Sequence, residues 1–67
     1  MNVRLTSREL VSFGRYPYSR GRLNAEDIRI IDQALDYMDL MGMQDRYLEE
    51  LSGGQRQRVA VGRALVN

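Results

Sequence analysis

The chain has 67 residues, which allows one domain with a thin core, because a domain this small buries only about 60% of the surface of its unfolded chain. It contains no cysteine and no histidine, so disulfides, thiolate metal sites and the commonest general base are excluded. All ten basic residues are arginine, and a chain without lysine cannot form the usual phosphate loop that holds a nucleotide. We therefore expect no self-contained catalytic site.

The net charge of +1 is unevenly spread along the chain. Residues 1 to 23 carry +4, residues 24 to 50 carry −6, and residues 51 to 67 carry +3. Such blocks are usually solvated helix faces, although a basic end can also meet an anionic partner. No apolar run is long enough for a bilayer span and the N-terminus has no signal-peptide pattern, which favours a cytoplasmic setting.

The first predicted element is a helix over residues 7 to 13. Thr6 and Glu9 stand at the two positions of a capping box, which satisfies backbone N–H groups at a helix start. Gly14 is expected to adopt the left-handed conformation that ends many helices. The fold thus begins with a short, well-capped helix.

Residues 15 to 23 are predicted to form a loop, because Pro17 pushes the residue before it toward an extended conformation. Two readings of this loop remain open. Tyr16 and Tyr18 can pack the loop onto the core, which is the simpler one. Aromatic and arginine side chains are also enriched where proteins dock partners.

The second predicted helix starts after Asn24, a good N-cap, and ends at Gly42. Apolar residues recur along it at helical spacing and predict its core face: Ile28, Ile31, Leu35 and Met38. Residues 43 to 51 then predict a short helical turn that rests on Tyr47, Leu48 and Leu51. The acids of this turn are expected to be solvated.

The third predicted helix follows Ser52, which forms a capping-box pattern with Gln55. Its apolar face is expected from Val59, Ala60, Val61, Ala64, Leu65 and Val66. A glycine inside a helix costs about 0.8–1.0 kcal/mol relative to alanine, and two glycines follow this cap directly. The first turn is thus not optimised for stability.

Two explanations of Gly53 and Gly54 are open. Without side chains, the unpaired N–H groups of the first turn lie open at the positive end of the helix dipole, beside the Ser52 hydroxyl, and can bind phosphate or another anion. Alternatively, the pair permits a tight turn or a close helix contact. Physical chemistry alone does not choose between them.

Residues 51 to 58 read LSGGQRQR, and this run resembles the complete signature motif of ABC transporter ATPases. The run VSFGRYPY at residues 11 to 18 and the acidic helix after it are similar to importer ATPases for iron siderophores, haem and vitamin B12. The resemblance covers nearly the whole chain. It implies a small three- to four-helix, all-α bundle over residues 1–67, the helical subdomain of a larger P-loop ATPase.

The resemblance implies that the remaining ATPase parts lie outside these residues. Nothing here matches the Walker A lysine, the Walker B acid or the switch histidine of the family, so we expect no hydrolysis by this chain alone. ATP and Mg²⁺ are expected in the full protein and not on this segment. Met1 is expected to mark a cut just downstream of the Q-loop glutamine.

In the family, the signature of one subunit meets ATP held by the opposite subunit. The resemblance therefore assigns nucleotide contacts in trans to Ser52, Gly53, Gly54 and Gln55, with the Ser52 hydroxyl on the γ-phosphate. No catalytic residue and no metal ligand is assigned. Arg56 and Arg58 are expected to pair with the acids of residues 45 to 50.

The same resemblance implies three partners: the RecA-like core of the same ATPase, a second ATPase subunit and a transmembrane permease. Separated from that core, the segment should expose apolar surface, so we expect marginal stability or self-association. Arg15, Tyr16, Pro17 and Tyr18 are the expected permease contacts. The protein is expected at the inner face of the cell membrane and to serve uptake of a ferric siderophore or related iron chelate.

Two other functions compete with this reading. One is a small nucleic-acid binder in which residues 53 to 66 form a recognition helix. About ten residues separate the second and third predicted helices, whereas a helix-turn-helix uses a turn of about 3–4 residues, so nucleic acid is not expected. The other, a generic helical interaction module, explains the caps but not the complete signature.

Overall fold

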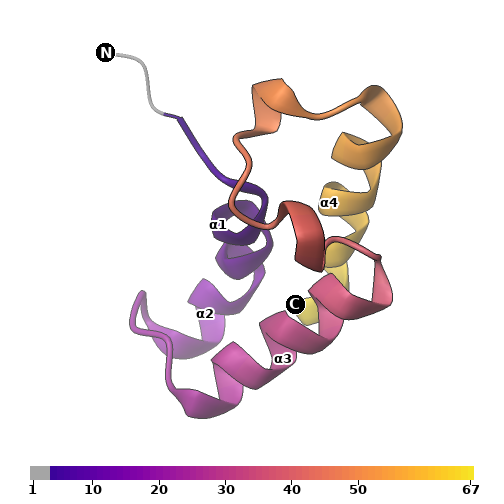
Figure 1. The fold of residues 1–67 in the computed structure, drawn as a ribbon. Coiled ribbons are helices and arrows are strands. Elements are labelled where there is room, and N and C mark those ends of the chain that lie inside the picture. Colours follow the sequence, from indigo (N-terminus) through magenta and orange to yellow (C-terminus); the bar gives the residue numbers. More distant parts are fainter. Residues whose placement is uncertain (1–3) are drawn as a thin grey trace.

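Four α-helices and three 3-10 turns make up residues 4–67, the part of the chain that the computed structural model describes (Figure 1). No strand occurs in that part, and its one isolated bridge joins Thr6 to Tyr47. The all-α prediction is confirmed. The elements are α1 (Ser7–Ser12), η1 (Phe13–Arg15), α2 (Tyr16–Ser19), α3 (Ala25–Tyr37), η2 (Met41–Met43), η3 (Leu48–Glu50) and α4 (Gly53–Val66).

Each of the three predicted helix starts is held by the cap that the sequence indicates. Thr6 Oγ1 accepts from the Glu9 N–H at 3.1 Å, and the Thr6 N–H donates to Glu9 Oε1 at 2.8 Å. Asn24 and Asp27 form the same reciprocal pair at the start of α3. Because these bonds satisfy N–H groups that have no partner inside the helix, they define where α1 and α3 begin.

The core lies where α1, α3 and α4 meet, with α4 packed against α1, η1 and α3 (Figure 1). Side chains from all three helices close it, together with Leu40 and Leu51 from the connecting segment. Its buried apolar residues are Val11, Ile31, Ala34, Leu35, Leu40, Leu51, Val59 and Val66. No helix within residues 4–67 combines the length and apolar character needed to cross a bilayer.

The prediction that Gly14 ends the first helix in a left-handed conformation is wrong. The chain continues through η1 into α2, and Gly14 is not among the residues with positive φ. A Cβ atom at this position would overlap the Arg63 carbonyl oxygen and the Val66 side chain. Glycine is needed here because η1 approaches α4 closely, a contact that local sequence does not reveal.

The predicted loop over residues 15 to 23 is also partly wrong, because its first half is helical. Pro17 lies in the first turn of α2, where its missing N–H removes no helical hydrogen bond. The chain then reverses at Arg20 and Gly21, whose φ angles are 54° and 81°. The sequence correctly indicated a turn in this segment, but the turn lies after Pro17, at Arg20 and Gly21.

Helix α3 ends at Tyr37 rather than at Gly42. Asp39 takes the left-handed conformation, with φ of 57°, and Gly42 lies inside η2. Aspartate tolerates this conformation better than most residues, so it can terminate a helix without glycine. Ile28 is exposed, so the predicted core stripe begins at Ile31.

The buried face of α4 differs from the predicted one. Val59, Gly62 and Val66 face the core. Four of the six expected residues are instead exposed: Ala60, Val61, Ala64 and Leu65. The sequence pattern was apolar on more than one side, and only the neighbouring helices determined which side is covered.

Candidate functional site

Ser52 holds the start of α4 in a reciprocal cap on the surface. Its Oγ accepts from the Gln55 N–H at 3.2 Å, and its own N–H donates to Gln55 Oε1 at 2.9 Å. Leu51, the residue before the cap, is buried and anchors the chain at this point. Because the hydroxyl accepts in this cap, its proton remains available to donate to a ligand.

The structure separates the two explanations of the glycine pair. Neither Gly53 nor Gly54 has a positive φ, and a Cβ atom at either position would meet nothing within 4 Å. A tight turn or a close helix contact therefore does not require them. Their N–H groups find no backbone acceptor within residues 4–67, as expected for a first helical turn. Open donors at the positive end of a helix favour the anion-binding explanation.

Arg56 supports this turn in a way that the sequence did not predict. Its Nε donates to the Leu48 carbonyl at 2.9 Å and its Nη2 to the Glu49 carbonyl at 3.4 Å. The acids of residues 45 to 50 were the expected partners, and neither Arg56 nor Arg58 forms an ion pair within the described chain. Arg56 instead ties η3 to the first turns of α4.

The tyrosines around Pro17 do not pack onto the core. Tyr16 and Tyr18 are exposed, Tyr18 by 59%, and Pro17 is exposed as well. The Phe13 and Tyr16 rings lie 5.0 Å apart in a tilted arrangement, which anchors one edge of this surface. The first reading, in which both tyrosines pack onto the core, is therefore wrong, and the docking reading stays a prediction.

Arg15, unlike its three neighbours, points inward. Its Nε donates to Asp27 Oδ1 at 2.9 Å and its Nη1 to the Val66 carbonyl at 3.0 Å. The pairing of Arg15 with Asp27 was not predicted from the sequence. The two residues are 12 positions apart, so the contact has no local sequence signal and depends on how the chain between η1 and α3 folds.

Asp27 is the one charged side chain buried in the described core, only 2% exposed. The Asp27 carboxylate accepts a hydrogen bond from the Asn24 N–H, and this bond lowers the pKa of Asp27. Burial raises this pKa, whereas the contact with Arg15 lowers it further. Asp27 is therefore ionised at neutral pH, which keeps its pairing with Arg15 intact.

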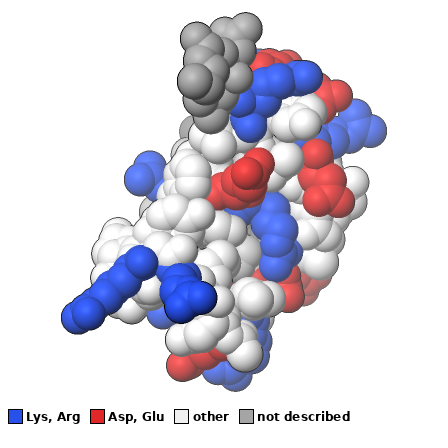
Figure 2. Space-filling view, turned by 90° about the vertical axis from the view of Figure 1, so that its left-hand side faces the viewer, with Lys and Arg blue, Asp and Glu red and all other residues white. Residues whose placement is uncertain are grey.

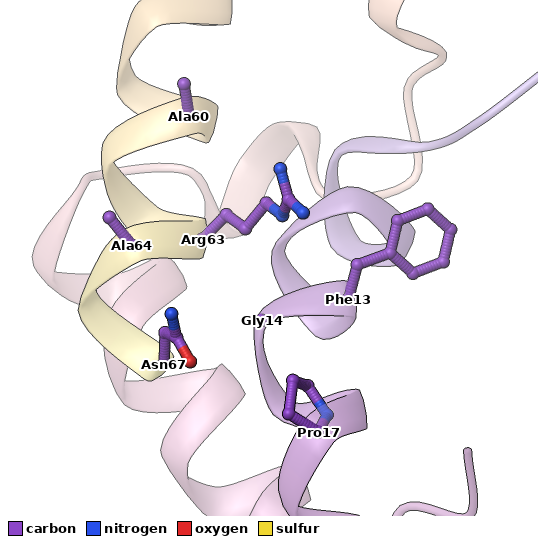
Figure 3. A pocket seen from close by; sticks show the side chains of 7 residues that line it. All are labelled: Phe13, Gly14, Pro17, Ala60, Arg63, Ala64 and Asn67. Atoms are coloured by element: carbon purple, nitrogen blue, oxygen red, sulfur yellow. The ribbon is translucent and has the colours of Figure 1, made fainter. Parts of the chain in front are cut away.

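A hollow of about 310 Å³ lies at the other end of α4, between that helix and the η1–α2 segment (Figure 3). Phe13, Pro17, Ala60 and Ala64 line it, and the Arg63 side chain extends across from α4 (Figure 3). Residues 4–67 contain no group of three acidic side chains that could hold a metal ion.

Comparison with known proteins identifies the class. The model of the ABC transporter family matches residues 2–67, so the chain belongs to that family. It is 58% identical over 63 residues to the petrobactin import ATP-binding protein FatE of Bacillus anthracis, which covers 94% of this chain and 25% of that protein. It is 59% identical over 61 residues to the corresponding protein YclP of Bacillus subtilis, covering 91% and 24%.

A solved structure agrees with this assignment. A metal-chelate type ABC transporter in an inward-facing conformation superimposes with a TM-score of 0.89 at 29% identity, over 98% of this chain and 27% of that one. The chain spans about a quarter of the length of the curated relatives it matches. The family is therefore established, and the resemblance read from the signature motif is confirmed.

Proposed function

We propose that residues 1–67 are the helical subdomain of the ATP-binding subunit of an ABC importer, and that this subdomain presents the Ser52–Gln55 turn to ATP held by the opposite subunit. The observation that carries the proposal is the glycine pair at the start of α4. The fold requires neither glycine, yet both leave open N–H donors beside a serine hydroxyl. Residues that local stability does not explain tend to mark functional sites.

Each residue of the turn has a distinct role in this proposal. Ser52 donates its hydroxyl proton to the γ-phosphate, and Gly53 and Gly54 offer backbone N–H groups. Gln55 closes the cap through its Oε1 and lies next to the nucleotide. These donors are held in place before ATP arrives, so little reorganisation is needed to meet its negative charge.

ATP and Mg²⁺ belong to the full protein in this proposal, and this chain alone hydrolyses nothing. With no lysine and no histidine, it lacks the groups that would hold the phosphates or act as a switch. The RecA-like core of the same ATPase supplies them. Two such subunits then close around ATP, and the signature of each completes the site of the other.

The proposed transporter contact is the surface around Pro17. Tyr16, Pro17 and Tyr18 are exposed next to each other, with Arg15 below them. Exposed tyrosines make good anchors because they bury a large area with few rotatable bonds. A permease held there would place the protein at the cytoplasmic face of the membrane.

The proposed cargo is a ferric siderophore or a related iron chelate. Support comes from the relatives, three of which are petrobactin import ATP-binding proteins and one of which, from Bacillus subtilis, is an iron(3+)-hydroxamate import ATP-binding protein. This part of the proposal rests on these similarities alone.

A chimeric ATPase tests the proposal directly. The matching segment of the Bacillus subtilis relative YclP is replaced by this chain, and ATP hydrolysis is measured with its permease present. We expect the chimera to hydrolyse ATP and Ser52→Ala to reduce the rate about a hundredfold, the usual effect of removing one donor to developing charge.

Thr6→Ala is the matched control, because it removes an equivalent capping hydroxyl at the start of a different helix, α1. The control should retain most of the hydrolysis rate. Equal rates for Ser52→Ala and the unmodified chimera would refute the proposed phosphate contact. ATP turnover by the purified 67-residue chain would refute the claim that it has no activity alone.

The flanking gene sequence gives an independent check. A Walker A motif upstream and a Walker B motif downstream are expected in the same reading frame. Absence of both would exclude the subdomain assignment, whatever the chimera does.

A further inference from the structure

One guanidinium group connects three parts of the fold that are far apart in sequence. Arg15 Nε donates to Asp27 at the start of α3, and Nη1 donates to the Val66 carbonyl at the end of α4. The face of the same group lies 4.4 Å from the centre of the Tyr18 ring. We propose that Arg15 is a positioning residue. It fixes the exposed Tyr18 ring relative to the end of α4 and does not itself contact the permease.

The Asp27 carboxylate gives this arrangement a rigid base. Its Oδ2 accepts from the Asn24 N–H at 3.0 Å while its Oδ1 accepts from Arg15. Both side chains are largely shielded, with the Arg15 side chain 18% exposed and that of Asp27 3%. Bonds between charged groups in such surroundings are shorter and stronger than neutral ones. Arg15 therefore has little freedom to turn outward toward a partner.

The bond to Val66 joins this base to α4. Arg15 Nη1 donates to the Val66 carbonyl at 3.0 Å, so the guanidinium group ties this part of α4 to the η1–α2 segment. Gly14 also approaches Arg63 and Val66 closely, so η1 and α4 are in direct contact next to this bond.

Arginine is suited to this task and lysine is not. The planar guanidinium presents separate N–H groups to a carboxylate and a carbonyl while its face stacks on an aromatic ring. A lysine ammonium keeps the charge but cannot make all three contacts at once. Tyr18 owes its orientation to this stacking, because the ring itself is mostly exposed.

As a consequence, Tyr18 and the Ser52–Gln55 turn are held at fixed positions relative to the same helix, α4. A helix of 14 residues rises about 21 Å at 1.5 Å per residue. Arg15 holds one end of this helix, and Ser52 caps the other. The partner's identity rests on the proposed function, whereas the positioning of Tyr18 and Val66 does not.

The first experiment uses the 67-residue chain alone and compares Asp27→Asn with the wild type by NMR. The wild-type Arg15 side-chain protons should show an upfield shift from the Tyr18 ring, and the Tyr18 ring should make contacts to Arg15. We expect Asp27→Asn to remove both signatures while far-UV circular dichroism shows that the helices persist. Arg29→Lys, on an exposed arginine of α3, is the matched control.

The second experiment measures the affinity of the chimeric ATPase for its permease. If Arg15 acts through Tyr18, then Arg15→Lys and Tyr18→Ala should each weaken binding about tenfold, and the double variant should be no weaker than Tyr18→Ala. Asp27→Asn should reproduce the Arg15→Lys loss, although buried Asp27 cannot touch a partner. Such non-additivity distinguishes positioning from direct contact.

Two results would overturn the inference. One is an Arg15 side chain in the isolated chain that shows no ring-current shift and no contact to Tyr18. The other is an Asp27→Asn chimera that binds with wild-type affinity while Arg15→Lys is weakened, which would make Arg15 a contact residue. If the unmodified chimera does not bind the permease at all, the proposed function fails, and the NMR result alone decides the positioning.

Discussion

Glycine serves two opposite purposes in this chain. Gly14 is required by packing, because a side chain there would overlap α4. Gly53 and Gly54 have open space around them and ordinary helical φ angles, so packing does not explain their presence. The residue type alone predicts neither purpose. The space around each Cβ position separates a glycine that the fold needs from one that the proposed function needs.

The Asp27 carboxylate should make stability depend on pH. Because its pKa is lowered in the folded state, the stabilisation is fully present above the ordinary aspartate pKa of about 3.9 and is lost as pH falls through the lower folded pKa. Urea unfolding at a series of pH values should therefore show a falling free energy of unfolding below pH of about 4.

Asp27→Asn should be less stable at neutral pH and show a shallower loss in acid. Asp45→Asn, at an exposed position, is the control and should leave the acid dependence as in the wild type. An unchanged acid slope in Asp27→Asn would show that the Asp27 carboxylate does not contribute to acid unfolding.

Helix α4 shows how one element combines stability with a proposed site. Its core face, Val59, Gly62 and Val66, packs against α1 and α3. Its first turn is capped by Ser52 but carries two glycines that weaken it. The cap and the core face hold the helix, so the turn can remain open.

Substitutions in the first turn of α4 should move stability in opposite directions. In the isolated chain, Gly54→Ala should raise the free energy of unfolding by about 0.5–1 kcal/mol, because alanine has less backbone entropy to lose. Ser52→Ala should lower it by about 0.5–2 kcal/mol through loss of the cap. Urea denaturation followed by circular dichroism measures both.

Gly14→Ala is the contrasting control for Gly54→Ala. It should lower stability by about 1–3 kcal/mol, because the added methyl overpacks the contact with α4. A loss of stability in Gly54→Ala would show that the fold itself needs that glycine, and the main support for the proposed phosphate contact would be gone.

Across the whole molecule, the charge blocks of the sequence are interleaved. Three pairs join the basic N-terminal block to the acidic middle: Arg4 with Glu49 at 3.3 Å, Arg8 with Asp32 at 2.7 Å, and Arg15 with Asp27 at 2.9 Å. Figure 2 shows basic and acidic side chains interspersed on the face that it presents. The first pair is exposed and contributes little, whereas the third is shielded.

The isolated chain should self-associate and be only marginally stable. Val61 and Leu65 of α4 are 44% and 53% exposed, and a chain of 67 residues has a small core to offset such surface. Sedimentation equilibrium should show species heavier than the 7.8 kDa monomer. The double variant Val61→Gln and Leu65→Gln should shift the distribution toward the monomer.

The substitution pair Glu26→Gln and Asp36→Asn alters exposed side chains of α3 and serves as the control. It should leave the association unchanged. A monodisperse wild-type monomer that melts cooperatively at high temperature would contradict both parts of this prediction.

Local rules were enough for the caps, the fold class and the signature. Thr6, Asn24 and Ser52 each lie within three residues of their partners, so their bonds depend on no distant part of the chain. The signature run at residues 51 to 58 is likewise contiguous. The sequence alone therefore determined where three helices begin, and it pointed to the family that the comparisons establish.

Tertiary structure decided the features that depend on distant neighbours. It determined which side of α4 is buried, why Gly14 must be glycine, and that Arg15 turns inward to Asp27. A hydrophobic pattern states only that apolar side chains are present, because burial depends on which elements pack against them. The open space around Gly53 and Gly54 shows that packing requires no glycine at either position, which the motif could not reveal.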